Sequence, residues 1–444
     1  MGRCAVSTQK QKRPFALRAL AAFAGTLAIL FVLLLAAYAL PGERVRQHVY
    51  DSARTIQNEG LYPEYLGFKL FQMDNYTDTL MLFEAASADE LPPLQAMMTN
   101  TAYNVDNFET LADDLAWYIE KDWSTGAQRT DAPALEPFSY ARYWHGYLIW
   151  LRPLLLLMPF TGVRIVQYIV LFALLAVVLV QLRRRCGLRA AVWFAVSQLA
   201  VSVWFVPHQV QYFTCFMIAY AGCAWVLAKP RRSDVLCLGL LVLGTATAFC
   251  DLLVTPIITL GLPLTCWLLE PQQRLRGGVP QCALAVGGSL CWGTGYALCW
   301  AGKWALAGAV TNNNVLADAL HQAEVRTTAD TWHGMELTWR NISIFLYDTL
   351  TSHHLFWPAL AVLAVLIALF ILSIRSKTAL VRALPLALTT CMTPAWFVLL
   401  RTHSIQHGWF TWRAFGLTVF AGLAFLYYAC DLRAARRRLQ KGSI

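Results

Sequence analysis

Charged residues are scarce in this sequence: Asp, Glu, Lys and Arg make up 14% of its 444 residues. Soluble domains carry about 25% charged residues, whereas 57% of this chain is hydrophobic and its mean hydropathy is +0.47. A water-soluble core of this size cannot bury so much apolar surface. The composition therefore excludes a soluble enzyme, a disordered chain and a disulfide scaffold.

Several motifs are also missing. Cysteine is absent between residues 41 and 140 although the chain has twelve, and no Cys/His set has zinc-ligand spacing. We therefore expect buried, inert thiols. There is no P-loop or other nucleotide motif, so ATP-driven transport by this chain alone is not expected. The net charge of +10 is expected from membrane topology and not from nucleic acid binding.

Apolar runs long enough to cross a bilayer recur from end to end. Ten spans are predicted, at residues 15–40, 162–182, 189–206, 210–228, 235–250, 252–269, 279–300, 355–374, 383–400 and 409–430. The predicted fold class is an all-α polytopic membrane protein. A cleaved signal peptide is the alternative for the first run, since Ala37-Tyr38-Ala39 fits a cleavage site.

The distribution of charge predicts the orientation. With a cytoplasmic N-terminus (residues 1–14) and a basic cytoplasmic tail (431–444), the inside segments hold 22 basic and three acidic residues. The outside segments hold 14 basic and 23 acidic residues. This asymmetry follows the positive-inside rule. We place the chain in the cell (plasma or inner) membrane, with extracytoplasmic loops at residues 41–161 and 301–354.

The stretch 143–160 is hydrophobic but is not counted as a span. Counting it would reverse every later segment and move Arg183–Arg185 outside. It is rich in aromatic residues and contains Pro153 and Pro159. We predict an interfacial or re-entrant helix on the outer face.

Two acids of the first loop are candidate catalytic residues. Asp74 and Asp78 lie in QMDNYTD, residues 72–78, and their spacing of four predicts one helical face. Such a pair can divide the roles of base and orienting group, or hold a divalent cation. The alternative is a solvated loop face, because the loop has 17 acids.

Cationic and imidazole side chains gather near the predicted outer ends of the spans. Those predicted to bind a lipid phosphate are His145, Arg152, Lys303, His403, His407 and Arg413. The alternatives are an aromatic anchor for residues 143–160 and a snorkelling side chain for Lys303. His208 and Asp251 are predicted to face a polar cavity, because ionisable groups avoid lipid.

The layout resembles the GT-C superfamily of membrane glycosyltransferases. One span is followed by a long acidic outer loop and then by YWHGYL, residues 143–148, before a span that ends in Arg183–Arg185. The resemblance covers roughly residues 15–270. The family's common Lys/His-Pro-Pro element is absent, since Gly146 follows His145.

The resemblance implies a function and its site. Members take sugars from polyprenyl-phosphate donors, with an acid of the first outer loop as base or metal ligand. Asp74 matches first and Asp78 second, while Glu43 and Asp51 lie closer to the first span and remain alternatives. His145 matches the residue that contacts the donor phosphate. The cofactor, if there is one, is a divalent cation at the two aspartates.

We therefore expect sugar transfer from a lipid-linked donor to a cell-envelope acceptor on the extracytoplasmic face. The expected partners are this donor and membrane lipids, not nucleic acid. Two alternatives remain: a transporter or flippase of a lipid-linked saccharide, and a non-catalytic protein of envelope assembly. A carrier would place charges near the middle of its spans, whereas the charges here lie toward their ends.

Overall fold

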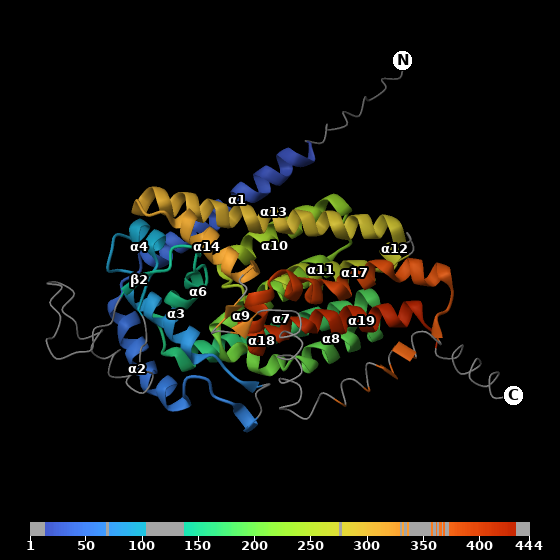
Figure 1. Ribbon diagram of the computed structural model, residues 1–444, viewed down its shortest axis with the longest axis horizontal. Helices are drawn as coiled ribbons and strands as arrows, with labels where there is room; N and C mark the ends of the chain where they lie inside the picture. The colour runs from blue at the N-terminus through green and yellow to red at the C-terminus, as the bar shows by residue number, and fades with distance from the viewer. Residues whose placement is uncertain are drawn as a thin grey trace, which may run out of the picture.

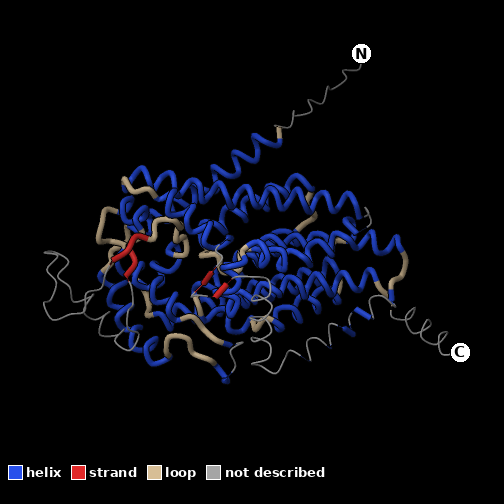
Figure 2. Tube along the Cα trace, viewed as in Figure 1, coloured by secondary structure: helices blue, strands red, loops and turns tan. Residues whose placement is uncertain are grey.

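The computed structural model describes residues 14–67, 71–103, 137–274, 278–328 and 373–431. It also describes residues 331–332, 335–336, 357, 361, 364–365 and 367–368. Helices dominate these parts of the chain, and the strands form two short antiparallel pairs (Figure 2). The fold class is therefore all-α.

The first third of the chain alternates a long apolar helix with shorter amphipathic elements. The elements are α1 (Phe15–Tyr38), α2 (Glu43–Glu59), the 3-10 turn η1 (Tyr65–Gly67), α3 (Asn75–Ser87), α4 (Pro93–Thr99), β1 (Thr101–Tyr103), β2 (Pro137–Ser139) and α6 (Leu148–Leu155). Strands β1 and β2 pair with Ala102 opposite Phe138.

Long helices make up most of the remainder. They are α7 (Phe160–Cys186), α8 (Leu188–Ala200), η4 (Val203–His208), α9 (Val210–Ala228), α10 (Ser233–Cys250), α11 (Ile257–Leu269), α12 (Pro271–Arg274), α13 (Gly278–Thr311) and α14 (Val315–Thr328). After β3 (Thr331–Trp332) and β4 (Met335–Glu336) come α17 (Lys377–Leu399), α18 (Arg401–Thr411), η5 (Trp412–Ala414) and α19 (Phe415–Ala429).

Seven described helical segments are long and apolar enough to cross a membrane. They are Phe15–Tyr38, Phe160–Cys186, Val210–Ala228, Ser233–Cys250, Gly278–Thr311, Lys377–Leu399 and Arg401–Ala429. Each overlaps one predicted span. More than half of the predicted span 355–374 lies outside the described residues.

Two predicted spans are shorter in the structure. Helix α8 ends at Ala200 because Ser202 has a positive φ of 55°, and a 3-10 turn containing Pro207 follows. Helix α11 begins only at Ile257, after a loop in which Leu253 has a φ of 68°. Each has 13 residues, about 20 Å of helix, which is less than a bilayer core.

The prediction for residues 143–160 also needs correction. The helix there, α6, covers only Leu148–Leu155, with Pro153 inside it. Residues 143–147 form turns before it, so His145 lies outside the helix. Helix α6 packs against α1, α2 and α7 and buries Leu148, Leu151 and Leu155. The helix is therefore shorter than predicted and packs against other helices of the bundle.

The bundle has two distinct ends (Figure 1). Helices α2, α3, α4 and α14 gather at one end, which we call the α3 end. Helix α12 and the start of α17 mark the opposite end, which we call the α12 end. Helices α10 and α13 pack closely along the bundle because Gly244 faces the carbonyl of Trp292, and a Cβ there would lie 2.0 Å from its oxygen.

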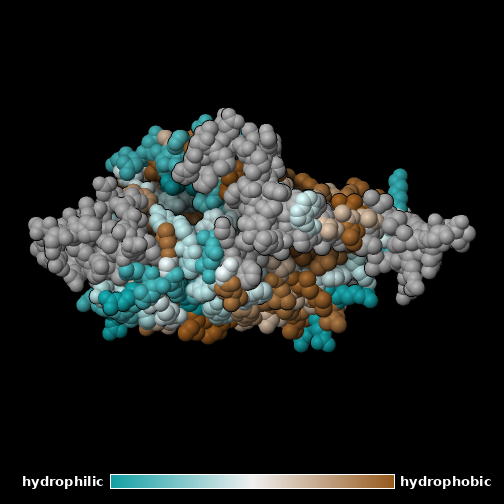
Figure 3. All heavy atoms as spheres, turned by 60° about the horizontal axis from the view of Figure 1, so that its bottom comes forward, coloured by the Kyte–Doolittle hydropathy of each residue, from teal (hydrophilic) through white to brown (hydrophobic). Residues whose placement is uncertain are grey.

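The outer surface of the long helices is apolar, and Figure 3 shows a hydrophobic region flanked by polar side chains. Exposed members include Ile165 and Ile169 on α7 and Val286 and Leu290 on α13. Because water-soluble bundles place polar residues on such faces, this surface is suited to lipid contact.

Candidate functional site

Asp74 and Asp78 lie one turn apart at the start of α3. Asp74 is the N-cap, and its carboxylate accepts hydrogen bonds from the Thr77 N–H (3.0 Å) and hydroxyl (2.7 Å). Asp78 accepts one from the Val210 N–H at the start of α9 (3.1 Å). Burial raises the pKa of Asp74, and it raises that of Asp78 well above its usual range. Both carboxyl groups therefore cap helices.

The aspartate pair and Arg413 both lie near Tyr212 of α9. Tyr212 of α9 is within electrostatic range of Asp74 and Asp78, and its ring centre is 4.5 Å from the Arg413 guanidinium. A second aromatic contact joins Tyr62 to Trp409 of α18, with 5.4 Å between ring centroids. Tyr212 thus lies between the aspartate pair and Arg413, which are not shown to contact one another.

His208 belongs to a separate ion-pair cluster. Arg164 of α7 donates two hydrogen bonds to Glu59 of α2, at 2.6 and 2.9 Å, and a third to the His208 carbonyl. The His208 ring contacts the Tyr65 hydroxyl at 3.1 Å. Burial favours a higher pKa for Glu59, but the His208 ring, 3.8 Å away, and the hydrogen bonds from Arg164 outweigh it and bring the pKa to about 2. This cluster fastens α2 to α7.

His145 points into a buried polar network around Glu84 of α3. Its Nδ1 is 2.8 Å from Glu84 Oε2, which also accepts a hydrogen bond from the Tyr147 hydroxyl. Its Nε2 is 3.0 Å from the Tyr140 carbonyl oxygen. Glu84 is 2% exposed and His145 is 1% exposed. His145 is therefore held by protein groups on both sides of the ring.

Lys303 is also buried within electrostatic range of Glu84, and Arg152 is buried near Tyr38, which both Glu84 and Arg152 influence. The Lys303 ammonium donates to the Met97 carbonyl (2.7 Å) and to Asn100 Oδ1 (2.5 Å), and Glu84 is within electrostatic range. Arg152 donates to the Leu40 carbonyl at 2.8 Å. We call this set, with His145 and Tyr147, the Glu84 network. It lines neither of the two cavities described below.

The loop before α6 positions this network. His145 adopts a left-handed φ of 55°, and the Gly146 N–H donates to the Phe249 carbonyl at the end of α10 (2.8 Å). A Cβ at Gly146 would lie 2.5 Å from that oxygen, so only glycine allows the approach. The Trp144 ring stacks on Phe249, with centroids 4.8 Å apart.

His403 and His407 lie beside the loop that begins with Asp251. Asp251 follows α10 and accepts a hydrogen bond from the Val254 N–H (3.2 Å). Burial raises its pKa to about 6. His403 Nε2 is 2.9 Å from the Leu253 carbonyl oxygen, and its ring centroid is 4.7 Å from that of His407.

A cavity of about 110 Å³ opens beside this group, and we call it the aromatic cavity. Its walls come from the residue 142–143 turn, the 251–256 loop, α13, α14 and the end of α17. The lining residues that matter below are Arg142, Tyr296, Trp300, Trp304, Arg326 and Trp396. Asp251 is within electrostatic range of Tyr296.

Polar atoms at this cavity lack partners within the described part of the chain. The Tyr296 hydroxyl and the Trp300 indole N–H are buried without a hydrogen bond, as is His403 Nδ1 nearby. A buried polar group left unpaired costs about 1–3 kcal/mol. Such a concentration is typical of a site that takes water or a ligand.

The sequence contains signals for some site residues that were not among the predicted ones. Glu84 is the one acid in the apolar run TLMLFEAA, residues 79–86. Trp292, Tyr296, Trp300 and Trp304 recur every four residues along one face of α13. Arg326 has no such signal, because only the packing of α14 against α18 and α13 brings it to the cavity.

Within the described ranges, no group of three or more His, Cys, Asp and Glu side chains is arranged to hold a metal ion. Asp74 and Asp78 thus have no third ligand of these types among those residues. Comparison of the chain with models of known families, with curated proteins and with solved structures found no match.

Proposed function

We propose that this protein is a membrane glycosyltransferase that moves a sugar from a polyprenyl-phosphate donor to a cell-envelope acceptor. The proposal places the α3 end on the extracytoplasmic side, as the charge asymmetry of the sequence predicts. The observation that carries it is the aromatic cavity, which tryptophans and two arginines line; the buried Asp251 carboxyl group, whose pKa is raised, is within electrostatic range of the lining Tyr296.

The lining of the cavity suits the phosphate end of such a donor. Arg142 is partly paired with Asp318 at 3.3 Å, and Arg326 lies 6.0 Å above the Tyr143 ring. Guanidinium groups bind phosphate oxygens through paired hydrogen bonds. Trp300 and Trp304 offer flat apolar surface for the first prenyl units. The rest of the prenyl chain would extend into lipid along the exposed Leu306 of α13 and Leu399 of α17.

Asp251 is the best-placed general base. A pKa of about 6 leaves the carboxyl group mostly ionised at neutral pH yet able to accept a proton. It would take the proton of an acceptor hydroxyl, whose oxygen bonds to the anomeric carbon. The bond from that carbon to the phosphate oxygen breaks, and polyprenyl phosphate leaves with the bonding electrons, stabilised by the arginines. Asp74, the choice from the sequence, is the second candidate.

The test uses the full chain in lipid nanodiscs with a polyprenyl-phosphate-linked, radiolabelled hexose. We expect the unaltered chain to release label from the lipid. Asp251→Asn should still bind the donor but release label at a rate reduced by about 100-fold or more. Asp74→Asn reports on the second candidate, and Asp234→Asn at the α12 end is the matched control.

Each outcome decides between the candidate functions. Failure to bind polyprenyl phosphate would overturn the proposal. Binding without any release of label would favour the flippase alternative. Unchanged release by Asp251→Asn together with loss by Asp74→Asn would return the catalytic role to the α3 aspartate.

A further inference from the structure

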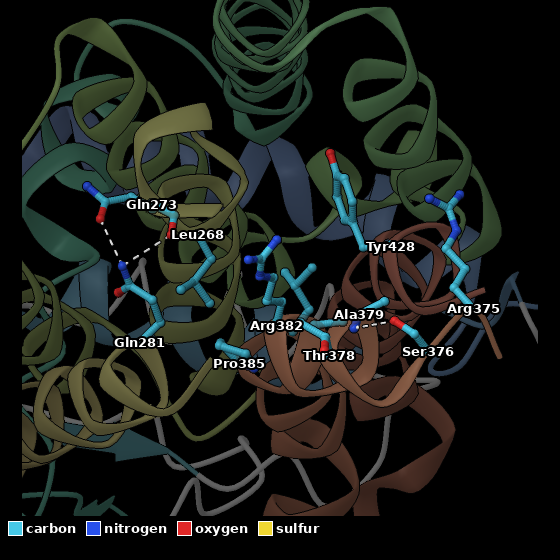
Figure 4. Close-up of a pocket in the computed structure, with 12 residues that line it drawn as sticks. Leu268, Gln273, Gln281, Arg375, Ser376, Thr378, Ala379, Arg382, Pro385 and Tyr428 are labelled. Carbon is cyan, nitrogen blue, oxygen red and sulfur yellow. Dashed lines mark hydrogen bonds between the residues drawn. The ribbon is translucent and has the colours of Figure 1, made fainter. Parts of the chain in front are cut away.

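A second cavity of about 330 Å³ lies at the α12 end, away from the proposed active site. Five helices (α11, α12, α13, α17 and α19) and the residue 375–376 turn surround it, and its polar lining includes Gln273, Gln281, Arg375, Arg382 and Tyr428. In Figure 4, Arg382 lies between the two glutamines on one side and Tyr428 and Arg375 on the other. No Asp or Glu is among the residues that line this cavity.

The positive charge at this cavity is available to a ligand. Arg375 donates to the Cys430 carbonyl and so has a structural contact. Arg382 is exposed, and no described carboxylate pairs with it. Helix α17, 23 residues long, begins here with Ser376 as its N-cap, so the positive end of its dipole adds to the arginines.

A buried glutamine gives the cavity a second requirement. Gln281 of α13 is 2% exposed, and its Nε2 donates to the carbonyl and the side chain of Gln273. Its Oε1 is buried and has no hydrogen-bond partner in the described part of the chain. A hydroxyl group on an anionic ligand would satisfy this oxygen while the anion meets the arginine.

The surroundings indicate an amphiphile. Val279 of α13 and Val381 and Leu384 of α17 are exposed apolar side chains within a few residues of the cavity lining. Polar cavities that open between lipid-facing helices near their ends lie at headgroup depth. A soluble phosphate would leave these apolar side chains uncovered.

From these observations we propose that the α12-end cavity binds the headgroup of an anionic, hydroxyl-bearing glycerophospholipid of the phosphatidylglycerol type. Its phosphate lies against Arg382 and the start of α17, a headgroup hydroxyl donates to Gln281 Oε1, and the acyl chains follow Val279 and Leu384. The proposal does not depend on the glycosyltransferase assignment, because none of these residues belongs to the aromatic cavity.

The experiment measures lipid binding to the delipidated full chain in neutral detergent by native mass spectrometry. We expect phosphatidylglycerol to bind more tightly than phosphatidylcholine, and Arg382→Gln to weaken phosphatidylglycerol binding about tenfold. Arg382→Lys should restore part of the loss. Arg184→Gln removes an exposed arginine from the end of α7 and is the charge-matched control.

Two further measurements test the role of the headgroup hydroxyl and whether the bound phosphate belongs to a lipid or to a soluble compound. Gln281→Leu should abolish the preference for phosphatidylglycerol over phosphatidic acid, which lacks the headgroup hydroxyls. Glycerol 3-phosphate should compete weakly, and equal binding of this soluble phosphate would overturn the assignment to a lipid. Equal effects of Arg382→Gln and Arg184→Gln would reduce the site to nonspecific surface charge and refute the proposal.

Discussion

The Glu84 network and the aromatic cavity both place polar side chains in the interior of the α3 end, but they differ in how those groups are paired. In the Glu84 network, His145 and Lys303 each have at least two protein partners, and the one unpaired oxygen of Glu84 lines neither cavity. At the aromatic cavity, the Tyr296 hydroxyl and the Trp300 N–H have no partner among the described residues, and both side chains line the cavity. Paired groups stabilise a fold, whereas unpaired groups beside a cavity can bind a ligand. The difference separates structural histidines and lysines from candidate binding groups better than their chemistry does.

The largest expected effect tests the structural side of this comparison. Lys303→Met should lower the free energy of unfolding by about 3–5 kcal/mol, because it leaves buried carbonyl oxygens and the Glu84 carboxyl group without their cation. Thermal unfolding in detergent measures it. Lys229→Met, at an exposed position after α9, is the control and should change little. Equal effects of the two would remove Lys303 from its structural role.

Substitution of Asp251 should raise the free energy of unfolding, whereas substitution of Lys303 should lower it. The folded pKa of Asp251, about 6, lies above the ordinary value of 3.8, so the folded state favours the protonated form. The unaltered protein and Asp251→Asn should be equally stable below about pH 4. Above pH 6, Asp251→Asn should be more stable than the unaltered protein by about 3 kcal/mol. Unfolding temperatures of the two from pH 4 to pH 8 measure this. A difference that shrinks as the pH rises contradicts the prediction.

Glu59 provides a structural carboxylate for comparison. Its pKa falls from 4.5 to about 2 in the fold, so its stabilising effect is present above pH 4.5 and is lost as the pH falls toward 2. We expect Glu59→Gln to cost about 2 kcal/mol at pH 7, because Arg164 loses its ionised partner. Unfolding temperatures at pH 7 and pH 3 test the trend, and a larger cost at pH 3 would be incompatible with it.

The smallest expected effect concerns ligand binding at the cavity. Arg326→Gln should weaken the binding of polyprenyl phosphate about tenfold, which corresponds to about 1.4 kcal/mol, and should leave unfolding unchanged. Quenching of tryptophan fluorescence measures the affinity, since Trp300 and Trp304 line the site. Arg184→Gln at the exposed end of α7 serves as the control. A loss of affinity in the control equal to that in Arg326→Gln would argue against a distinct phosphate site.

The sequence predicts the long helices well because length and hydropathy alone define them. It fails at α8, α11 and α6, where positive φ angles at Ser202, Leu253 and His145 end or delay the helix, and no periodicity reveals these conformations. Among site residues, the spacing of Asp74 and Asp78 predicts their adjacency. The pairing of His145 with Glu84, 61 positions earlier, depends on tertiary packing, and so does the meeting of Arg142, Arg326 and Trp396 at one cavity.

The close contact of Gly146 with Phe249 fixes the short segment that connects the aromatic cavity with the Glu84 network. Tyr143 lines the aromatic cavity, and His145, two residues later, belongs to the Glu84 network. Between them, Trp144 is clamped by its stacking on Phe249 and by its indole N–H on the Cys299 carbonyl. A ligand that displaces Tyr143 would therefore strain residues 143–145, because Trp144 is fixed between them. The fluorescence of Trp144 should then report whether the cavity is occupied.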